Sequence, residues 1–276
     1  MKLNDDLIIN SATKKQLEAY LRAPVHALLL FGEPGVGLGS IARYLAKKLS
    51  GSNVIEIAPT IHKNQVTNII NADDVSEIGS LVRSKRTKRL TILIDGVDQT
   101  APGVFEHLLK LIEEPTPNIN YLFTAHVIAR LPDTILSRCG QIRVLSPSAN
   151  QTNRLIEELP ASERTKIAFI ASGLPAEINR LINDQSYRDT QMELFTKAKQ
   201  FLVSSPAERI NIINDFSDRR EALEFCRIIA RLLTLTSLKN PPNHIAASLD
   251  AVNKAIERLS NNGNYKLQLL SLVWRV

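Results

Sequence analysis

The stretch Gly32-Glu33-Pro34-Gly35-Val36-Gly37-Leu38-Gly39-Ser40 decides how this chain folds. It nearly fits the pattern G-x-x-x-x-G-K-[ST], in which backbone N–H groups cradle phosphates, a lysine neutralises them and a hydroxyl binds Mg²⁺. Gly32 and Gly37 occupy the two glycine positions, but Leu38 stands at the lysine position and Gly39 at the hydroxyl position. The sequence therefore predicts a phosphate-loop turn that has lost its charge, inherited from an NTPase ancestor.

The residues on either side of this stretch support such a turn. Residues 26–31 form a continuous apolar run, as expected for a strand buried on both faces of a parallel sheet. Ile41, Leu45 and Leu49 recur every four residues, which indicates an amphipathic helix. A phosphate loop requires a strand, a turn and a helix in this order. A purely structural β–α turn has the same order, so that alternative stays open.

The first half of the chain alternates between apolar strand patterns and helical patterns. Helical patterns surround Val75 and Leu108, between strand-like segments. This alternation predicts an α/β domain over residues 1–147 with a parallel five-stranded sheet. The other four predicted strands cover residues 53–57, 90–95, 120–125 and 141–145.

The second half of the chain shows helical patterns. Residues 148–185 read as short helices broken at Pro160 and at Gly173-Leu174-Pro175, which predicts a small helical domain. Residues 186–276 read as longer helices and predict a third domain. The apolar faces of these helices contain Leu194, Ala198, Phe201 and Leu202, then Leu223, Cys226, Ile229, Ala230 and Leu233, and finally Leu249, Val252, Ile256 and Leu259.

Composition argues against a membrane protein, a disulfide-rich protein and a four-cysteine zinc protein. No apolar run approaches the roughly 20 residues that cross a bilayer, and residues 1–6 lack a signal-peptide core, so we expect a cytoplasmic protein with no membrane partner. Cys139 and Cys226 are the two cysteines, too few for a disulfide framework or a four-cysteine zinc site. The net charge of +6 and the basic run 83–89 suit a contact with nucleic acid, or a solvated helix end.

A second motif lies at the end of the predicted strand 90–95. An aspartate at the position of Asp95 holds Mg²⁺ in NTPases, and a glutamate usually follows it to polarise the attacking water. Here Gly96 takes the place of that glutamate, and Asp98 reads either as the cap of a turn or as a substitute base. Ser40 comes one residue too late to replace the hydroxyl, because one helical step rotates a side chain by about 100°. The losses at Leu38, Gly39 and Gly96 together predict that the chain does not hydrolyse ATP. Weak ATP binding through backbone N–H groups stays open.

Two longer motifs resemble a known family. Residues 105–115 resemble the helix end L-L-K-x-L-E-E-P, and residues 131–139 resemble L-P-x-T-I-L-S-R-C, of the AAA+ clamp-loader subunits of bacterial DNA polymerase III, the delta-prime branch above all. The resemblance spans roughly residues 15–185. It implies an AAA+ module, a helical lid at 148–185 and a helical oligomerisation collar at 186–276. It also implies gamma/tau-type ATPase subunits and delta as partners, with the sliding clamp and primer–template DNA contacted through the complex.

The same resemblance assigns site residues. Arg138, in Ser137-Arg138-Cys139, matches an arginine finger that acts in trans on the ATP of a neighbouring subunit; an ordinary ion pair at a helix end is the alternative. The family's sensor arginine is in doubt, because Ala176 follows the lid turn and Arg180 lies further along. His126 is expected on the surface, and neither a metal nor a cofactor is expected. The vestigial nucleotide site comprises Gly32, Gly35, Gly37, Leu38, Gly39, Asp95 and Thr124.

Two other functions compete with this interpretation. An active NTPase with unusual chemistry would bind and turn over nucleotide as an isolated chain. A DNA-binding adaptor outside any clamp loader would use the basic run 83–89 as its anchor, with binding that weakens steeply as salt rises.

Overall fold

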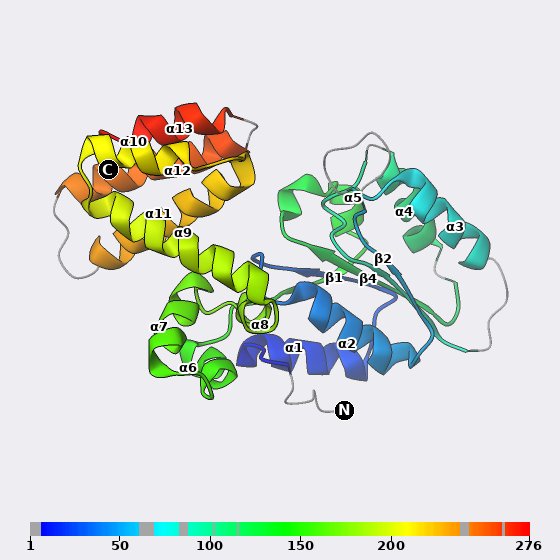
Figure 1. Cartoon of the computed structure of the whole chain (residues 1–276). Coiled ribbons are helices and arrows are strands. Elements are labelled where there is room, and N and C mark those ends of the chain that lie inside the picture. Colours follow the sequence, from blue (N-terminus) through cyan, green and yellow to red (C-terminus); the bar gives the residue numbers. More distant parts are fainter. Residues whose placement is uncertain are drawn as a thin grey trace. The chain divides into compact units, whose positions relative to one another are not determined.

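The computed structural model describes residues 7–60, 69–82, 88–101, 103–114, 116–237, 243–260 and 263–276 (Figure 1). The chain folds into two compact units: the first unit comprises Met1–Arg164 and Ala171–Asn179, and the second unit comprises Thr165–Ile170 and Arg180–Val276. The region expected as a separate lid, 148–185, therefore contributes to both units. The division into three domains stays a prediction.

The first unit is built on the predicted parallel sheet of five strands, in the order β2-β3-β4-β1-β5. Each neighbouring pair is parallel, with Phe31 opposite Ala125 and Ile94 opposite Phe123. The carboxyl ends of the central strands therefore meet at one edge of the sheet. The strands are β1 (Ala27–Phe31), β2 (Val54–Ile57), β3 (Leu90–Ile94), β4 (Ile119–Ala125) and β5 (Gly140–Arg143).

Helices cover both faces of this sheet (Figure 1). Two separate apolar cores result, one on each face. Successive strand residues point to opposite faces, so Leu28 and Leu30 pack with α1 (Ser11–Arg22) and α2 (Leu38–Ser50), while Leu29 packs with the helices of the other face. Those helices are α3 (Ala72–Val82), α4 (Val104–Glu113) and the short α5 (Asp133–Leu136), which follows the 3₁₀ turn η1 (Ile128–Arg130). Sequence patterns did not predict α1.

The segment after the sheet is helical and broken where the sequence predicts. Pro160 precedes α7, and Gly173-Leu174 separates α7 from α8. The elements are α6 (Ala149–Asn153), the 3₁₀ turn η2 (Arg154–Ile156), α7 (Ala161–Ile170) and α8 (Pro175–Asn183). None of the helices in the described ranges is both long enough and apolar enough to cross a membrane.

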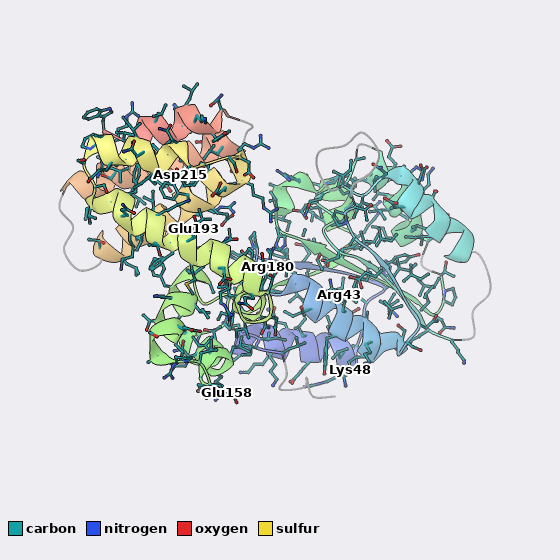
Figure 2. The ribbon with its side chains drawn as sticks, viewed as in Figure 1. Arg43, Lys48, Glu158, Arg180, Glu193 and Asp215 are labelled. Atoms are coloured by element: carbon teal, nitrogen blue, oxygen red, sulfur yellow. The ribbon has the colours of Figure 1, made fainter. Side chains whose placement is uncertain are left out.

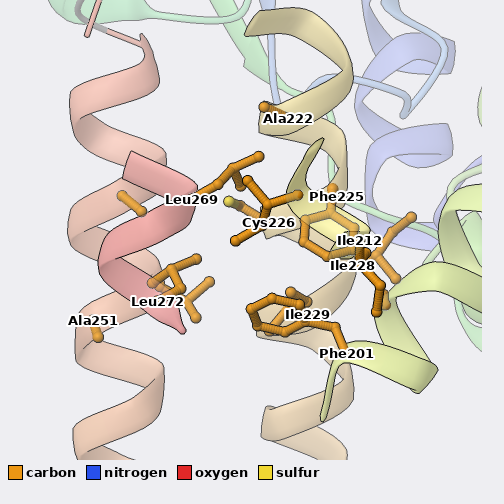
Figure 3. Close-up of a cluster of buried hydrophobic side chains, with 14 of the residues drawn as sticks. Phe201, Ile212, Ala222, Phe225, Cys226, Ile228, Ile229, Ala251, Leu269 and Leu272 are labelled. Atoms are coloured by element: carbon orange, nitrogen blue, oxygen red, sulfur yellow. The ribbon is translucent and has the colours of Figure 1, made fainter. Parts of the chain in front are cut away.

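The second unit is helical, with an apolar core of its own (Figure 3). The predicted apolar faces of α9 (Gln185–Val203), α11 (Arg219–Ser237) and α12 (Asn243–Ser260) contribute to this core, which confirms them. The shorter α10 (Pro206–Asn214) and α13 (Tyr265–Leu272) complete it. Pro241-Pro242, expected between two helices, lies outside the described residues.

Arg209 ties three parts of this helical unit together. Its guanidinium donates to the carbonyl oxygens of Phe201 (2.9 Å), Leu202 (3.4 Å) and Val273 (2.8 Å), which end α9 and α13. Helix C-termini leave carbonyl groups without partners inside the helix, and a cation there is favourable. The same guanidinium lies 5.2 Å from the ring centroid of Phe201.

We expect Arg209→Met, which retains an apolar stem, to lower the free energy of unfolding by about 2 kcal/mol, because hydrogen bonds to a charged group contribute about 1.5–3 kcal/mol. Urea unfolding followed by circular dichroism measures this loss. The matched control is Arg220→Met, an exposed arginine of the same unit. Equal midpoints for the two variants would show that Arg209 does not stabilise the helix ends.

Candidate functional site

The predicted site residues lie at the carboxyl edge of the sheet. The loop 32–37 joins β1 to α2, Asp95 follows β3, and Thr124 is near the end of β4. Ligands of open parallel sheets bind at this edge, where loops and helix N-termini converge. The fold therefore brings the two nucleotide-site motifs of the sequence together.

The loop has the strand–turn–helix geometry that the sequence predicts. Gly37 has φ of +90° and caps the N-terminus of α2, a backbone conformation that favours glycine. Its carbonyl accepts from Ile41 N–H at 2.9 Å, which begins the helix. Gly32 passes close to the chain after β5: a Cβ there would lie 2.6 Å from the carbonyl oxygen of Val144. The backbone conformation at Gly37 and the close contact at Gly32 therefore explain why glycine occupies these two positions of the loop pattern.

The two positions that normally carry a lysine and a hydroxyl are occupied differently here. Leu38 is 2% exposed and belongs to the core between the sheet and α2. Gly39 faces Asp95: a Cβ at Gly39 would lie 2.5 Å from Oδ2 of Asp95 and 3.1 Å from Nη2 of Arg43. Ser40 is exposed. A hydroxyl-bearing side chain at residue 39 would collide with the carboxylate in its present position.

Asp95 uses both carboxylate oxygens within the protein. Oδ1 accepts from the Thr124 hydroxyl at 2.6 Å, and that hydroxyl accepts from Gly96 N–H at 2.8 Å. Oδ2 accepts from Nη2 of Arg43 at 3.1 Å. Arg43 also donates from Nε to Oε1 of Glu56 on β2, at 2.8 Å. Thr124 therefore contacts Asp95 directly, so these two residues of the predicted nucleotide site lie together.

Arg43, labelled in Figure 2, and Glu56 are the residues that the sequence patterns missed. Arg43 comes four residues after Gly39, one turn further along the predicted helix, so it shares a face with the loop. Glu56 is the single charged residue in the apolar strand Val54–Ile57. These two signals are visible in the sequence, but nothing local indicates that both residues reach Asp95.

Asp98 and His126 lie beside this group. Oδ2 of Asp98 accepts from the backbone N–H groups of His126 (3.2 Å) and Val127 (2.9 Å), so Asp98 caps a turn, but one after β4 and not the turn that directly follows it in the sequence. His126 is exposed, as expected, and its Nδ1 lies 3.0 Å from the carbonyl oxygen of Gly32. Asp98 therefore holds the turn after β4.

The segment 171–179 packs on the loop within the first unit. Ala176 N–H donates to the carbonyl oxygen of Gly35 at 3.1 Å, and a Cβ on Gly35 would lie 3.0 Å from Cδ1 of Leu174. A cavity of about 50 Å³ remains beside the loop, far below the roughly 150 Å³ that holds benzene in an engineered core. It is lined by Leu7, Ile8, Val36, Ser40, Leu155 and Asn179, among others.

Arg180, the doubtful sensor arginine, belongs to the second unit. Its guanidinium carbon lies 3.7 Å from the ring centroid of Tyr187, a close cation–π contact. The basic run 83–89 falls mostly outside the described residues; its last two members, Lys88 and Arg89, are exposed.

Arg138 lies between α5 and β5, just before the amino-terminal end of β5, whereas the loop follows the carboxyl end of β1. Its Nη2 pairs with Oε1 of Glu113 at 2.9 Å, and its Nη1 donates to the carbonyl oxygen of Thr134 at 3.1 Å. The side chains of Arg138 and Glu113 are 39% and 45% exposed, so the guanidinium remains accessible from outside. Arg138 therefore forms an ion pair at a helix end, as the alternative interpretation expects, and its role as an arginine finger stays a prediction.

The cysteines are packing residues. Burial raises the pKa of the Cys139 thiol to about 11 and that of Cys226 to about 12. Neither side chain is a thiolate at neutral pH, and the thiolate is the nucleophile and the metal ligand. Cys139 therefore belongs to the apolar core of the first unit.

Sequence comparisons match the first half of the chain. The family described as DNA polymerase III, delta subunit, matches residues 9–148. DNA polymerase III subunit gamma of Buchnera aphidicola (subspecies Baizongia pistaciae) is 32% identical over 46% of this chain and 39% of its own length. DNA polymerase III subunit tau of Escherichia coli K12 is 30% identical over 49% of this chain and 24% of its own length. The chain thus spans well under half the length of these relatives.

Solved structures share the fold. A DNA polymerase III gamma subunit-related protein from Thermotoga maritima superposes with a TM-score of 0.60, covering 94% of this chain and 97% of that protein at 18% identity. A single-residue variant of RuvB from Thermotoga maritima superposes with a TM-score of 0.51 over 64% of this chain and 61% of that protein, at 20% identity. At such low identity these matches report the fold alone.

Proposed function

Because this chain belongs to the DNA polymerase III delta-subunit family, shown by the match to residues 9–148, we propose that it is a non-hydrolysing subunit of the clamp loader. In this role it helps load the sliding clamp on primer–template DNA during replication. Its neighbours are gamma/tau-type ATPase subunits and delta. It supplies Arg138 in trans to the ATP of an adjacent subunit.

One observation carries the proposed lack of hydrolysis: the carboxylate that would hold Mg²⁺ is bound to Arg43 instead. Mg²⁺ is bound through carboxylates together with the phosphates of the nucleotide. Here Oδ2 of Asp95 accepts from Arg43 at 3.1 Å, and Gly39 offers no hydroxyl. The residues present therefore do not fit a magnesium–nucleotide complex.

The remaining losses agree with this proposal. Leu38 is buried in the core and cannot make the charge-assisted hydrogen bonds of a lysine to phosphate. Gly96 replaces the carboxylate that would polarise water. The segment around Leu174 and Ala176 also contacts the loop directly. The three positions that would supply a phosphate-binding lysine, a metal-binding hydroxyl and a water-activating carboxylate thus carry Leu38, Gly39 and Gly96, which supports the proposal.

The exposed ion pair of Arg138 supports a role in trans. An ion pair between exposed side chains contributes about 0–1 kcal/mol, so exchanging Glu113 for a phosphate costs little. The pair with Glu113 keeps the guanidinium near the C-terminus of α4, in an accessible position. An arginine finger requires a charged, planar donor that can reach a phosphate outside its own chain.

Enzymatic assay of the purified full chain tests the proposal. With Mg-ATP it should release phosphate no faster than buffer, and a gamma/tau-type subunit assayed alongside serves as the active control. Mixed with gamma/tau-type and delta subunits, the chain should appear as a stoichiometric member of one complex in native mass spectrometry. Steady turnover by the lone chain would favour the active NTPase, and absence from the complex would contradict the clamp-loader role.

A further inference from the structure

We propose that Arg43 is a tethered cation that occupies the metal position of this site, and that its removal uncovers a divalent-cation site between Asp95 and Glu56. The inference deepens the proposed inactivity of the site and rests on it. It is carried by a cluster of three side chains from three elements: α2, β2 and the end of β3.

The geometry of the cluster is that of one guanidinium shared by two carboxylates. Nη2 of Arg43 lies 3.1 Å from Oδ2 of Asp95, and Nε lies 2.8 Å from Oε1 of Glu56. The other oxygen of Asp95 is held by the Thr124 hydroxyl, which fixes the carboxylate plane. The planar guanidinium of Arg43 can donate to two carboxylate oxygens held at fixed positions, one from Asp95 and one from Glu56. Both acids are therefore aimed at one point, and a cation occupies that point.

The position of Gly39 identifies the point as the metal position. In the phosphate-loop pattern the residue at this place provides the hydroxyl that binds Mg²⁺. A Cβ at Gly39 would lie 2.5 Å from Oδ2 of Asp95 and 3.1 Å from Nη2 of Arg43. The guanidinium of Arg43 thus lies within contact distance of the Cβ position at residue 39, from which a metal-binding hydroxyl would extend. Arg43 and a bound metal cannot occupy this space together.

Removing the guanidinium leaves two carboxylates facing each other next to water. The side chains of Asp95 and Glu56 are 22% and 36% exposed, so water can complete a coordination shell. Divalent cations such as Mg²⁺ and Mn²⁺ prefer oxygen ligands, and Mg²⁺ keeps several waters while binding one or two carboxylates. The repulsion between the two acids, no longer offset by Arg43, is relieved by a divalent cation.

The proposal has a consequence for attempts to reactivate the site. Restoring a lysine at Leu38 alone leaves Arg43 on Asp95, so metal binding should not return. Adding Arg43→Gln to that change should restore it. Arg43 is therefore a further inactivating feature, separate from Leu38, Gly39 and Gly96.

Manganese titration of the full chain, without nucleotide or partner subunits, tests the proposal by electron paramagnetic resonance of free Mn²⁺. Arg43→Gln and Arg43→Met should each bind one Mn²⁺ at least 10-fold more tightly than the wild type, and adding Asp95→Asn should abolish the gain. Lys47→Gln, which removes the same charge one turn further along α2, should bind no better than the wild type, and Arg43→Lys should also stay near wild type because it keeps a cation.

Two outcomes would overturn the proposal: unchanged Mn²⁺ affinity in both folded Arg43 variants, or equal gains in Arg43→Gln and Lys47→Gln. Folding is verified for each variant by circular dichroism. This titration does not involve ATP or assembly, so its failure leaves the clamp-loader role standing. Conversely, ATP turnover by the lone wild-type chain would refute the proposed function whatever the titration shows.

Discussion

Replacing Arg138 with alanine is expected to lower ATP hydrolysis at the neighbouring site of the assembled clamp loader by about 10³-fold, the lower end of the effect of arginine fingers. The charge that develops on the transferred phosphoryl group loses its stabilising guanidinium. The complex should still assemble, because Arg138 is partly exposed and contributes little to the fold. Phosphate release is measured in a complex whose other ATPase sites carry substituted Walker A lysines.

Three matched variants separate the finger from an ordinary ion pair. Arg138→Lys keeps the charge but lacks the planar fork, and should recover only part of the rate. Glu113→Gln breaks the ion pair and should leave hydrolysis within a few-fold of wild type. Arg130→Ala removes an exposed arginine of the same unit and should have no effect. If Glu113→Gln lowers hydrolysis as much as Arg138→Ala, the pair matters and the finger assignment is wrong.

Replacing Phe225 with alanine is expected to lower the free energy of unfolding of the second unit by about 3–5 kcal/mol. Phe225 is fully buried, next to Phe201 in the core of the second unit (Figure 3). Its ring centroid lies 5.5 Å from that of Phe201 and 4.7 Å from that of Phe216. Truncation removes these edge-to-face and tilted contacts and leaves a cavity. Natural domains have about 5–15 kcal/mol of stability in all, so this loss is large.

Urea unfolding combined with hydrogen exchange of α9 and α11 measures the effect and assigns it to the second unit. Phe225→Leu, which fills most of the space, should lose less than Phe225→Ala. Leu235→Ala on the same helix is the control, because its side chain is 49% exposed and its loss should stay within about 0.5 kcal/mol. Indistinguishable unfolding of Phe225→Ala and Leu235→Ala would show that the aromatic cluster does not hold this unit together.

The same variant also tests the collar prediction. If the second unit assembles the clamp loader, Phe225→Ala should be lost from the complex in native mass spectrometry, whereas Arg138→Ala should remain in it. The two substitutions are thus expected to affect different steps: Phe225→Ala should prevent assembly, and Arg138→Ala should lower hydrolysis after assembly.

Local patterns predicted most of the elements. Largely apolar runs identified the three central strands β1, β3 and β4, because a strand buried on both faces favours apolar residues along its whole length. The edge strands β2 and β5 were predicted from shorter segments that also contain charged residues. Four-residue spacing identified α2, α4 and the long helices of the second unit. The helix α1 was missed, because its buried face has few apolar residues, chiefly Leu17 and Tyr20, amid polar ones.

The chain's residues by themselves determined the order of strands and helices, the glycine turn and the loss of Lys and Ser/Thr at Leu38 and Gly39, since each depends on neighbours within a few positions. Only the tertiary structure decided that β1 lies between β4 and β5 and that Arg43 reaches both Asp95 and Glu56. Those contacts join residues 13 and 52 positions apart. The physical reason is that side-chain periodicity records which face of an element is buried, whereas a shared guanidinium depends on where the sheet places three separate elements.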